Sequence, residues 1–197
     1  MKRAFTLLEV VILLVIFILV AILVIPLSID DTIQARNVSK WKHAQAGLVE
    51  IPMSIKSLSH NRDTDLQSFV SALVKIHPLS NVTSYKIKYM NGDIPQDNYL
   101  FTQIYKTDEG ATIAFRWFDS PLIEPSTKRE ILGVLMYDVN GQSGPNVWGK
   151  DVYGMNIFAD KLEPFGQAAS DSEVEFDCSR QGTGLDCSSY YLQGGTF

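Results

Sequence analysis

The chain has 197 residues, which is enough for one domain with a substantial core, and it carries a net charge of −5 with 46% hydrophobic residues. An acidic balance argues against nucleic-acid binding, which favours basic surfaces. The hydrophobic residues are unevenly distributed: residues 10–27 contain no charged or polar side chain, whereas the sequence from Ser28 onward has the composition of a soluble protein.

The N-terminus combines two basic residues with this apolar run. Lys2 and Arg3 before an apolar stretch predict a cytoplasmic N-terminus and an exported C-terminal part. The run is too long for a secretory signal peptide and lacks a small-residue cleavage site, but its length suits a transmembrane helix. Glu9, at the start of the run, would cost ~2–3 kcal/mol in a bilayer and is therefore expected to have a function and a partner.

The stretch Ala4-Phe5-Thr6-Leu7-Leu8-Glu9-Val10, preceded by basic residues, resembles the processing site of type IV prepilins and of the pseudopilins of type II secretion. This resemblance implies a leader of residues 1–4, cleavage by prepilin peptidase between Ala4 and Phe5, and methylation of the new N-terminal Phe5. The family usually has Gly before the cut, so Ala4 departs from its pattern. The resemblance also implies a bacterial inner-membrane protein with a cytoplasmic N-terminus and a periplasmic head, which later enters a filament.

Cleavage gives Glu9 a physical role. The cut would create a positive α-amino group at Phe5, with a reference pKa near ~8. When the helices of a filament pack side by side, Glu9 of one subunit could neutralise the amine of its neighbour and so set their axial register. A simpler alternative places Glu9 at the headgroup level of the membrane. The implied partners are other pilin or pseudopilin subunits, prepilin peptidase and the inner-membrane assembly platform.

The first predicted element is one long helix. Residues 5–27 would form its transmembrane and filament-core half, and residues 28–51 an amphipathic half that backs a globular head of residues 28–197. Pro26 is expected to kink the helix without ending it, and Pro52 to stop it. The predicted apolar stripe of the second half consists of Ile29, Ile33, Val38, Trp41, Ala44, Leu48 and Ile51.

The rest of the head reads as one short helix followed by strands. Thr64 and Gln67 form a capping-box pattern for a helix with Phe69, Val70, Leu73 and Ile76 inward, and Pro78 closes it. Strand-like runs cover residues 85–90, 99–106, 111–118, 131–138 and 152–158. Their short intervals favour antiparallel pairing. The predicted fold class is thus α+β, with a long N-terminal helix packed on an antiparallel sheet, and the pilin resemblance implies the same architecture.

The loop 138–151 combines several oxygen-bearing side chains with three glycines and a proline. Calcium prefers six to eight oxygen ligands, so Asp138, Asn140 and Asp151 are candidate ligands, although the spacing does not fit an EF-hand. The alternative is a turn-rich connection whose Asn-Gly and Gly-Pro-Asn steps simply separate two strands.

The tail 167–197 is rich in Ser, Gly and Asp and contains both cysteines, Cys178 and Cys187. Their spacing does not fit a CxxC redox motif, and a metal site would need more ligands. A disulfide that closes a short loop is the simplest interpretation, and it implies an oxidising compartment such as the periplasm. Many type IV pilins have a C-terminal disulfide, so the resemblance implies the same pairing. Residues 190–192 are a candidate last strand.

None of the common catalytic motifs occurs in the sequence, so an enzyme is not expected. The leading hypothesis is a structural filament subunit, either a minor pilin or a pseudopilin. The alternative is a single-pass, membrane-anchored periplasmic binding domain that does not polymerise.

Overall fold

The computed structural model describes residues 6–51, 62–95 and 101–196, without the side chains of residues 23–29 and 62–65. The chain divides into two compact units, one ending at Arg36 and the other running from Asn37 to Thr196. Helix α1 (Leu7–Leu48) contributes to both, because its first turns lie before Arg36 and its last turns after Asn37.

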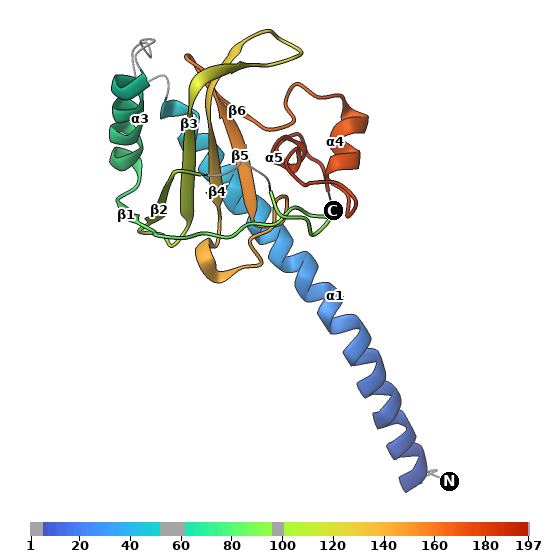
Figure 1. Cartoon of the computed structure of the whole chain (residues 1–197). Coiled ribbons are helices and arrows are strands. Elements are labelled where there is room, and N and C mark those ends of the chain that lie inside the picture. Colours follow the sequence, from blue (N-terminus) through green and yellow to red (C-terminus); the bar gives the residue numbers. More distant parts are fainter. Residues whose placement is uncertain (1–5, 52–61, 96–100, 197) are drawn as a thin grey trace. The chain divides into compact units, whose positions relative to one another are not determined.

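The second unit consists of the end of α1, a six-stranded sheet and three short helices (Figure 1). The remaining elements in chain order are α3 (Arg62–Ile76), β1 (Leu79–Asn81), β2 (Gln103–Thr107), β3 (Thr112–Ile123), β4 (Glu130–Asp138), the 3-10 turn η2 (Gly141–Ser143), β5 (Val152–Ile157), β6 (Leu162–Pro164), α4 (Asp171–Asp177) and α5 (Cys187–Tyr190).

The sheet has the order β1-β2-β3-β4-β5-β6, so each strand pairs with its neighbours in sequence. Every pairing is antiparallel, and from β2 to β6 each strand is joined to the next by a short connection rather than by a crossover. The longest ladder joins β3 and β4, in register from Thr112↔Asp138 to Trp117↔Gly133 and, after an irregularity, again at Leu122↔Ile131. The α+β class with an antiparallel sheet and an N-terminal helix is confirmed.

One face of the sheet packs against α1 and α3. Five positions of the predicted stripe are buried and therefore confirmed: Val38, Trp41, Ala44 and Leu48 in α1, and Ile51 after its end. Ile33, in the first unit, is exposed, and the side chain of Ile29 lies outside the described residues.

Trp41 is the central contact of this core. Its ring stacks on Tyr153 of β5 at a centroid distance of 5.1 Å, and its Nε1 donates a hydrogen bond to the Ser188 carbonyl oxygen at 2.9 Å. The buried indole therefore satisfies its only polar group while it contributes a large apolar area.

Helix α3 is confirmed, although it begins at Arg62, two residues before the predicted cap at Thr64. Phe69 and Leu73 are buried, as predicted, and Phe69 contacts Phe115 edge-on. Ile76 is exposed, contrary to prediction, because it lies in the last turn of the helix.

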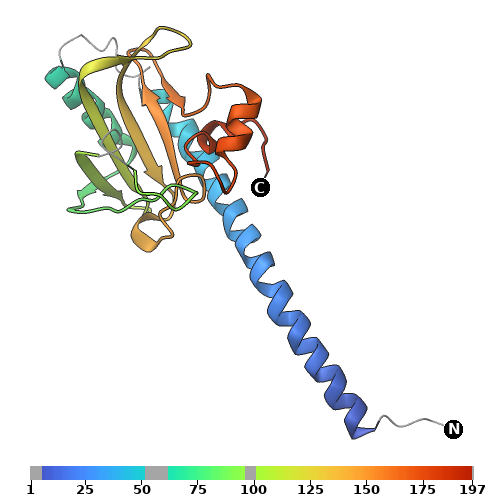
Figure 2. The same cartoon turned by 45° about the vertical axis from the view of Figure 1, so that its right-hand side comes forward.

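The second face of the sheet is covered by loops instead of a helix. Phe165, which follows β6, packs over Gly154 so closely that a Cβ there would lie 2.2 Å from the phenyl ring. Ala114, Val134, Met136 and Trp148 complete this smaller core. Figures 1 and 2 show α4 and α5 beside the β5–β6 edge.

Two strand predictions were wrong. Residues 85–90 form no strand but a loop with a single bridge, Lys88↔Val147. Their alternation is real, since Tyr85, Ile87 and Tyr89 pack on the second core, but it reflects a segment lying across a sheet rather than in it. The candidate strand 190–192 is instead the end of α5 and a turn.

Strands β1 and β6 were not predicted, because three residues are too short to show a periodicity. Pro52 and residues 99–100 lie outside the described residues. The expected helix stop and the first residues of the predicted strand 99–106 are therefore not placed.

Candidate functional site

The start of α1 is closed by a capping box that sequence analysis missed. The Thr6 backbone N–H and hydroxyl donate to Glu9 Oε2 at 2.8 and 2.9 Å, and the Glu9 N–H donates to Thr6 Oγ1 at 3.3 Å. The Thr-x-x-Glu spacing could have revealed it. Glu9 therefore has a role within its own chain, because this capping box satisfies N–H groups at the helix start. Ala4 and Phe5, the predicted processing residues, lie outside the described residues.

The first turns of α1 present an aliphatic surface on all sides. Every large apolar side chain from Leu7 to Ile22 is at least 41% exposed, and Leu7 reaches 83%. A contiguous apolar surface of this kind usually indicates contact with another protein or with lipid.

Within residues 6–51, 62–95 and 101–196, no helix is both long and apolar enough to cross a membrane. The side chains of residues 23–27, which close the predicted span 5–27, lie outside the described set, as does Phe5.

The loop between β4 and β5 brings together the three predicted calcium ligands. Asp138 ends β4 and Asp151 precedes β5, and both are fully buried. Asn140 lies between them in the loop, where its N–H donates to Asp138 Oδ1 at 3.0 Å and its Nδ2 donates to the Gly144 carbonyl oxygen at 2.9 Å.

Protein donors hold both carboxylates. Asp151 accepts the N–H groups of Asn146 at 2.9 Å and of Val147 at 2.7 Å. Asp138 Oδ2 accepts the hydroxyl of Tyr85, a residue that sequence analysis did not link to this loop because it lies 53 positions away. These bonds agree with the turn-rich alternative, in which the aspartates hold the loop together.

The loop nevertheless leaves two buried oxygens unused. Asn140 Oδ1 and Asn146 Oδ1 have no hydrogen-bond partner among the described residues. Asn146 has φ 54°, a left-handed conformation that asparagine tolerates better than most residues. The described residues contain no group of three or more His, Cys, Asp or Glu arranged for a metal ion, and this loop supplies two carboxylates.

Burial dominates the electrostatics of the loop. It raises the pKa of Asp138 to about 7, partly opposed by hydrogen bonds from Tyr85 and Asn140, and the nearby Asp151 carboxylate raises it further. Burial also raises the pKa of Asp151, against the hydrogen bonds from Val147 and Asn146. A cation would favour the ionised form of both groups.

Two side chains near the end of α1 donate hydrogen bonds to the loop. Asn37 Nδ2 donates to the Lys150 carbonyl oxygen and Lys40 Nζ to the Val139 carbonyl oxygen, each at 3.2 Å. The 3-10 turn η2 packs tightly against the β2–β3 turn, because a Cβ atom at Gly141 would lie only 2.2 Å from the Gly110 carbonyl oxygen. Helix and turn thus fix the loop on two sides.

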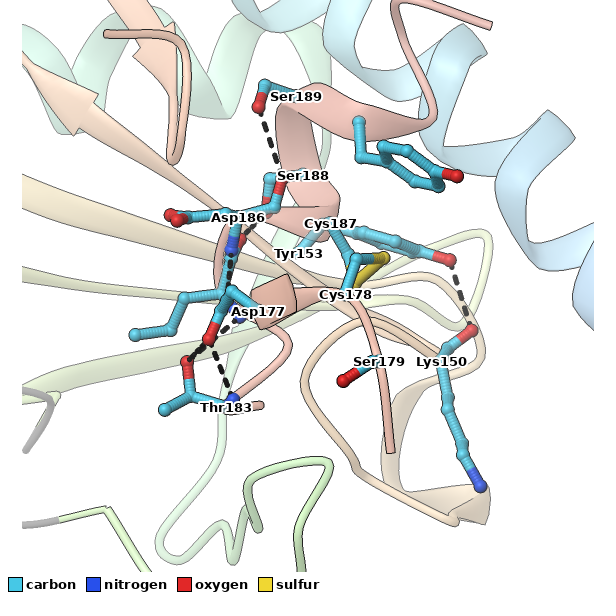
Figure 3. The surroundings of a disulfide bond; sticks show 12 residues. Lys150, Tyr153, Asp177, Cys178, Ser179, Thr183, Asp186, Cys187, Ser188 and Ser189 are labelled. Atoms are coloured by element: carbon cyan, nitrogen blue, oxygen red, sulfur yellow. Dashed lines mark hydrogen bonds between the residues drawn. A yellow bond between two sulfur atoms is a disulfide. The ribbon is translucent and has the colours of Figure 1, made fainter. Parts of the chain in front are cut away.

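The predicted disulfide between Cys178 and Cys187 is present, with Cα atoms 5.0 Å apart. Figure 3 shows the loop that it closes, in which the Asp177 carboxylate accepts bonds from the Thr183 N–H and hydroxyl and from the Asp186 N–H. Cys187 is fully buried next to the Trp41 core. The bridge therefore closes a loop within the tail, and the burial of Cys187 places this loop against the core.

Comparison of the chain with protein-family models, with curated proteins and with solved structures finds no match in any of the three. Function has to be argued from the residues and their geometry.

The raised pKa of Asp138 predicts a pH-dependent stability. Because the folded chain binds this proton more tightly than the unfolded chain, the free energy of unfolding should fall as pH rises from about 4 to about 7. Asp138 alone contributes at most about 4 kcal/mol to this fall. Denaturant unfolding of the full chain in detergent with EDTA, at a series of pH values, measures it.

Asp138→Asn should flatten this pH dependence, because the titrating group is removed while an acceptor for Tyr85 remains. Asp160→Asn, at an exposed aspartate of the β5–β6 turn, is the matched control and should leave it unchanged. If the free energy of unfolding changed equally with pH in the unmodified chain and in both variants, Asp138 would not be the titrating group.

Proposed function

We propose that this chain is a structural subunit, a minor pilin or pseudopilin, of a type IV pilus or type II secretion filament, and that it assembles through α1. The observation that carries the proposal is the exposed aliphatic surface from Leu7 to Ile22, whose only charged residue is Glu9. The same helix continues into an α+β head through its buried residues from Val38 to Leu48.

Packing of these helices would hold the chain in the filament once it has left the lipid. Relative to exposure to water, burying one large aliphatic side chain contributes about 1.5–3 kcal/mol, and every large apolar side chain from Leu7 to Ile22 is available. Such contacts are not directional, so they do not define how far one helix slides along its neighbour. A charged pair within the apolar bundle would define it.

Glu9 is suited to that pairing even while it caps its own helix. The cap uses only Oε2, and Oε1 accepts no hydrogen bond within the described part of the chain. After cleavage before Phe5, the amine of a neighbouring subunit could donate to Oε1. The cap would meanwhile hold the carboxylate at the helix start, which reduces the entropy lost on pairing.

The proposal includes the cellular route. Prepilin peptidase would remove residues 1–4, and the mature chain would wait in the bacterial inner membrane with its head in the periplasm. The assembly platform would then move it into a filament in the periplasm or at the cell surface. The disulfide supports an oxidising compartment. A membrane-anchored periplasmic binding domain that does not polymerise is the alternative, and the following experiments separate the two.

Mass spectrometry of the N-terminal peptide, from chain purified out of bacteria with a type IV pilus or type II secretion system, tests processing. The expected mature N-terminus is a methylated Phe5. Ala4→Gly should leave the cut in place and increase its extent, because Gly is the usual residue at this position in the family. An intact Met1, or a cut near Ser28, would exclude the filament proposal.

Two substitutions separate the charge of Glu9 from its capping role. Glu9→Gln retains an acceptor for the cap, since Gln also serves in a capping box, but removes the charge. It should therefore block incorporation into filaments, measured by shearing and immunoblotting, while membrane insertion and head folding stay normal.

Thr6→Ala is the matched control, because it weakens the cap by about 1 kcal/mol and keeps the carboxylate. Filaments should still form, in reduced amount. Normal assembly of the Glu9→Gln chain would remove the charge from the mechanism.

We also propose that the loop 138–151 binds one calcium ion. Two buried carboxylates with raised pKa values lie beside two buried amide oxygens that have no partner in the described residues. Asp138, Asn140, Asn146 and Asp151 would supply side-chain oxygens, and each carboxylate oxygen has a second lone pair beyond its present hydrogen bond. Loop carbonyls and water would complete the shell.

Calcium at about 5 mM should raise the melting temperature of the full chain in detergent by about 2–4 °C, for a dissociation constant typical of extracellular modules. Asn146→Gly, which tolerates the positive φ, should abolish the increase. Magnesium should act less, because it requires a tighter octahedral shell. The absence of any shift with calcium would exclude the site.

A further inference from the structure

A groove of about 640 Å³ lies on the second face of the sheet, between the β3–β4 hairpin and the segment after β6. Phe118 and Val134 contribute apolar surface from the strands, and Phe165 contributes its ring from the segment after β6. Leu122, on the hairpin, is 47% exposed beside them. An apolar groove with an exposed leucine at its edge suits an inserted apolar side chain.

All charged residues that line this groove are acidic: Glu124, Glu163, Glu173 and Asp186. Two of them already have counterions. Arg129 bonds Glu124 at 3.2 Å and Glu163 at 2.8 Å, and Lys161 also pairs with Glu163. The groove wall that contains Glu124 and Glu163 is therefore close to neutral, and its ion pairs with Arg129 and Lys161 hold these side chains in place.

The opposite wall of the groove, which contains Glu173 and Asp186, has unbalanced negative charge. Glu173 is bonded only to the Ser170 N–H and hydroxyl, which are neutral donors. The carboxylate of half-buried Asp186 accepts no hydrogen bond and forms no ion pair in the described part of the chain. Burial, together with the Asp177 and Glu173 carboxylates, raises the pKa of Asp186 to about 6, so this wall would gain from a positive partner.

The backbone around Asp186 fixes the direction of this carboxylate. Its N–H donates to Asp177 Oδ2 at 2.9 Å, and the next residue, Cys187, is held by the disulfide. In Figure 3 the Asp186 side chain points away from the disulfide loop. The carboxylate is thus held at the groove on a rigid support, which reduces the entropy lost on binding.

We propose that this groove binds a segment of another protein that presents a lysine or arginine next to an apolar side chain. The cationic group would pair with Asp186, and the apolar side chain would lie on Phe118 and Leu122. A metal ion would leave the apolar surface of Phe118 and Leu122 in the groove without a partner. A basic peptide satisfies both the charge of one wall and the apolar surface of the other.

Selection from a library of random short displayed peptides, on the full chain in detergent micelles, tests the proposal. The recovered peptides should be enriched in lysine or arginine adjacent to Leu, Ile or Phe. Asp186→Asn should lower their affinity about tenfold, because a charge-assisted bond is lost. Leu122→Ser should also weaken them. Thermal unfolding of each variant verifies that the head is folded.

Asp108→Asn is the matched control, an exposed aspartate in the β2–β3 turn at the opposite end of β3, and should leave the affinity unchanged. Selected sequences similar to residues 85–90 of this chain, which contain Lys86 and Lys88, would identify a second copy as the source of the segment. Peptides without basic residues, peptides that bind Asp186→Asn equally well, or no selection above background would each overturn the proposal.

Discussion

The stack of Trp41 on Tyr153 joins the end of α1 to β5, which lies far away in the sequence. Trp41 also donates to the Ser188 carbonyl, and the Ser188 hydroxyl accepts the Gly154 N–H at 2.8 Å, so the helix, β5 and the tail share one buried network. The disulfide anchors the residue before Ser188. Removing the indole would leave a large cavity and an unpaired carbonyl at once, which is why the rest of the head depends on this contact.

The end of α1, which Trp41 fixes on the sheet, also positions the loop between β4 and β5. Asn37 and Lys40, on the turns next to Trp41, donate hydrogen bonds to carbonyl oxygens of the loop. In the loop held in this way, Asp138 and Asp151 are fully buried. Burial of two carboxylates is unfavourable, and several N–H groups and the Tyr85 hydroxyl offset only part of the cost. The calcium proposal and the pH dependence of stability both follow from that remaining imbalance. The proposed calcium site and the acidic groove lie in the second unit, whereas the proposed filament contact lies on the first turns of α1.

The features that were predictable from sequence are local or periodic. The spacing of Val38, Trp41, Ala44 and Leu48 identified the buried side of α1, and four of the five strand-like runs match β2 to β5. Residues 85–90 misled for a physical reason, since alternate burial is the same for a strand and for a loop that crosses a sheet. Residues 190–192 were predicted as a strand because Tyr favours strands, whereas the N–H groups of Tyr190 and Tyr191 donate to the Asp186 and Cys187 carbonyl oxygens in a helical turn.

The sequence by itself determined the aliphatic run with Glu9 at its start, the amphipathic second half of the helix, the α+β class and the pairing of the only two cysteines. These depend on composition and on spacings within one element. Only the tertiary structure decided that Tyr85 bonds Asp138, that two asparagine oxygens remain unpaired in the loop, and that Asp186 faces a groove without a counterion. Each of these features depends on contacts between segments that are distant in sequence. The local spacing of residues does not predict which distant residues the packing of a sheet brings together.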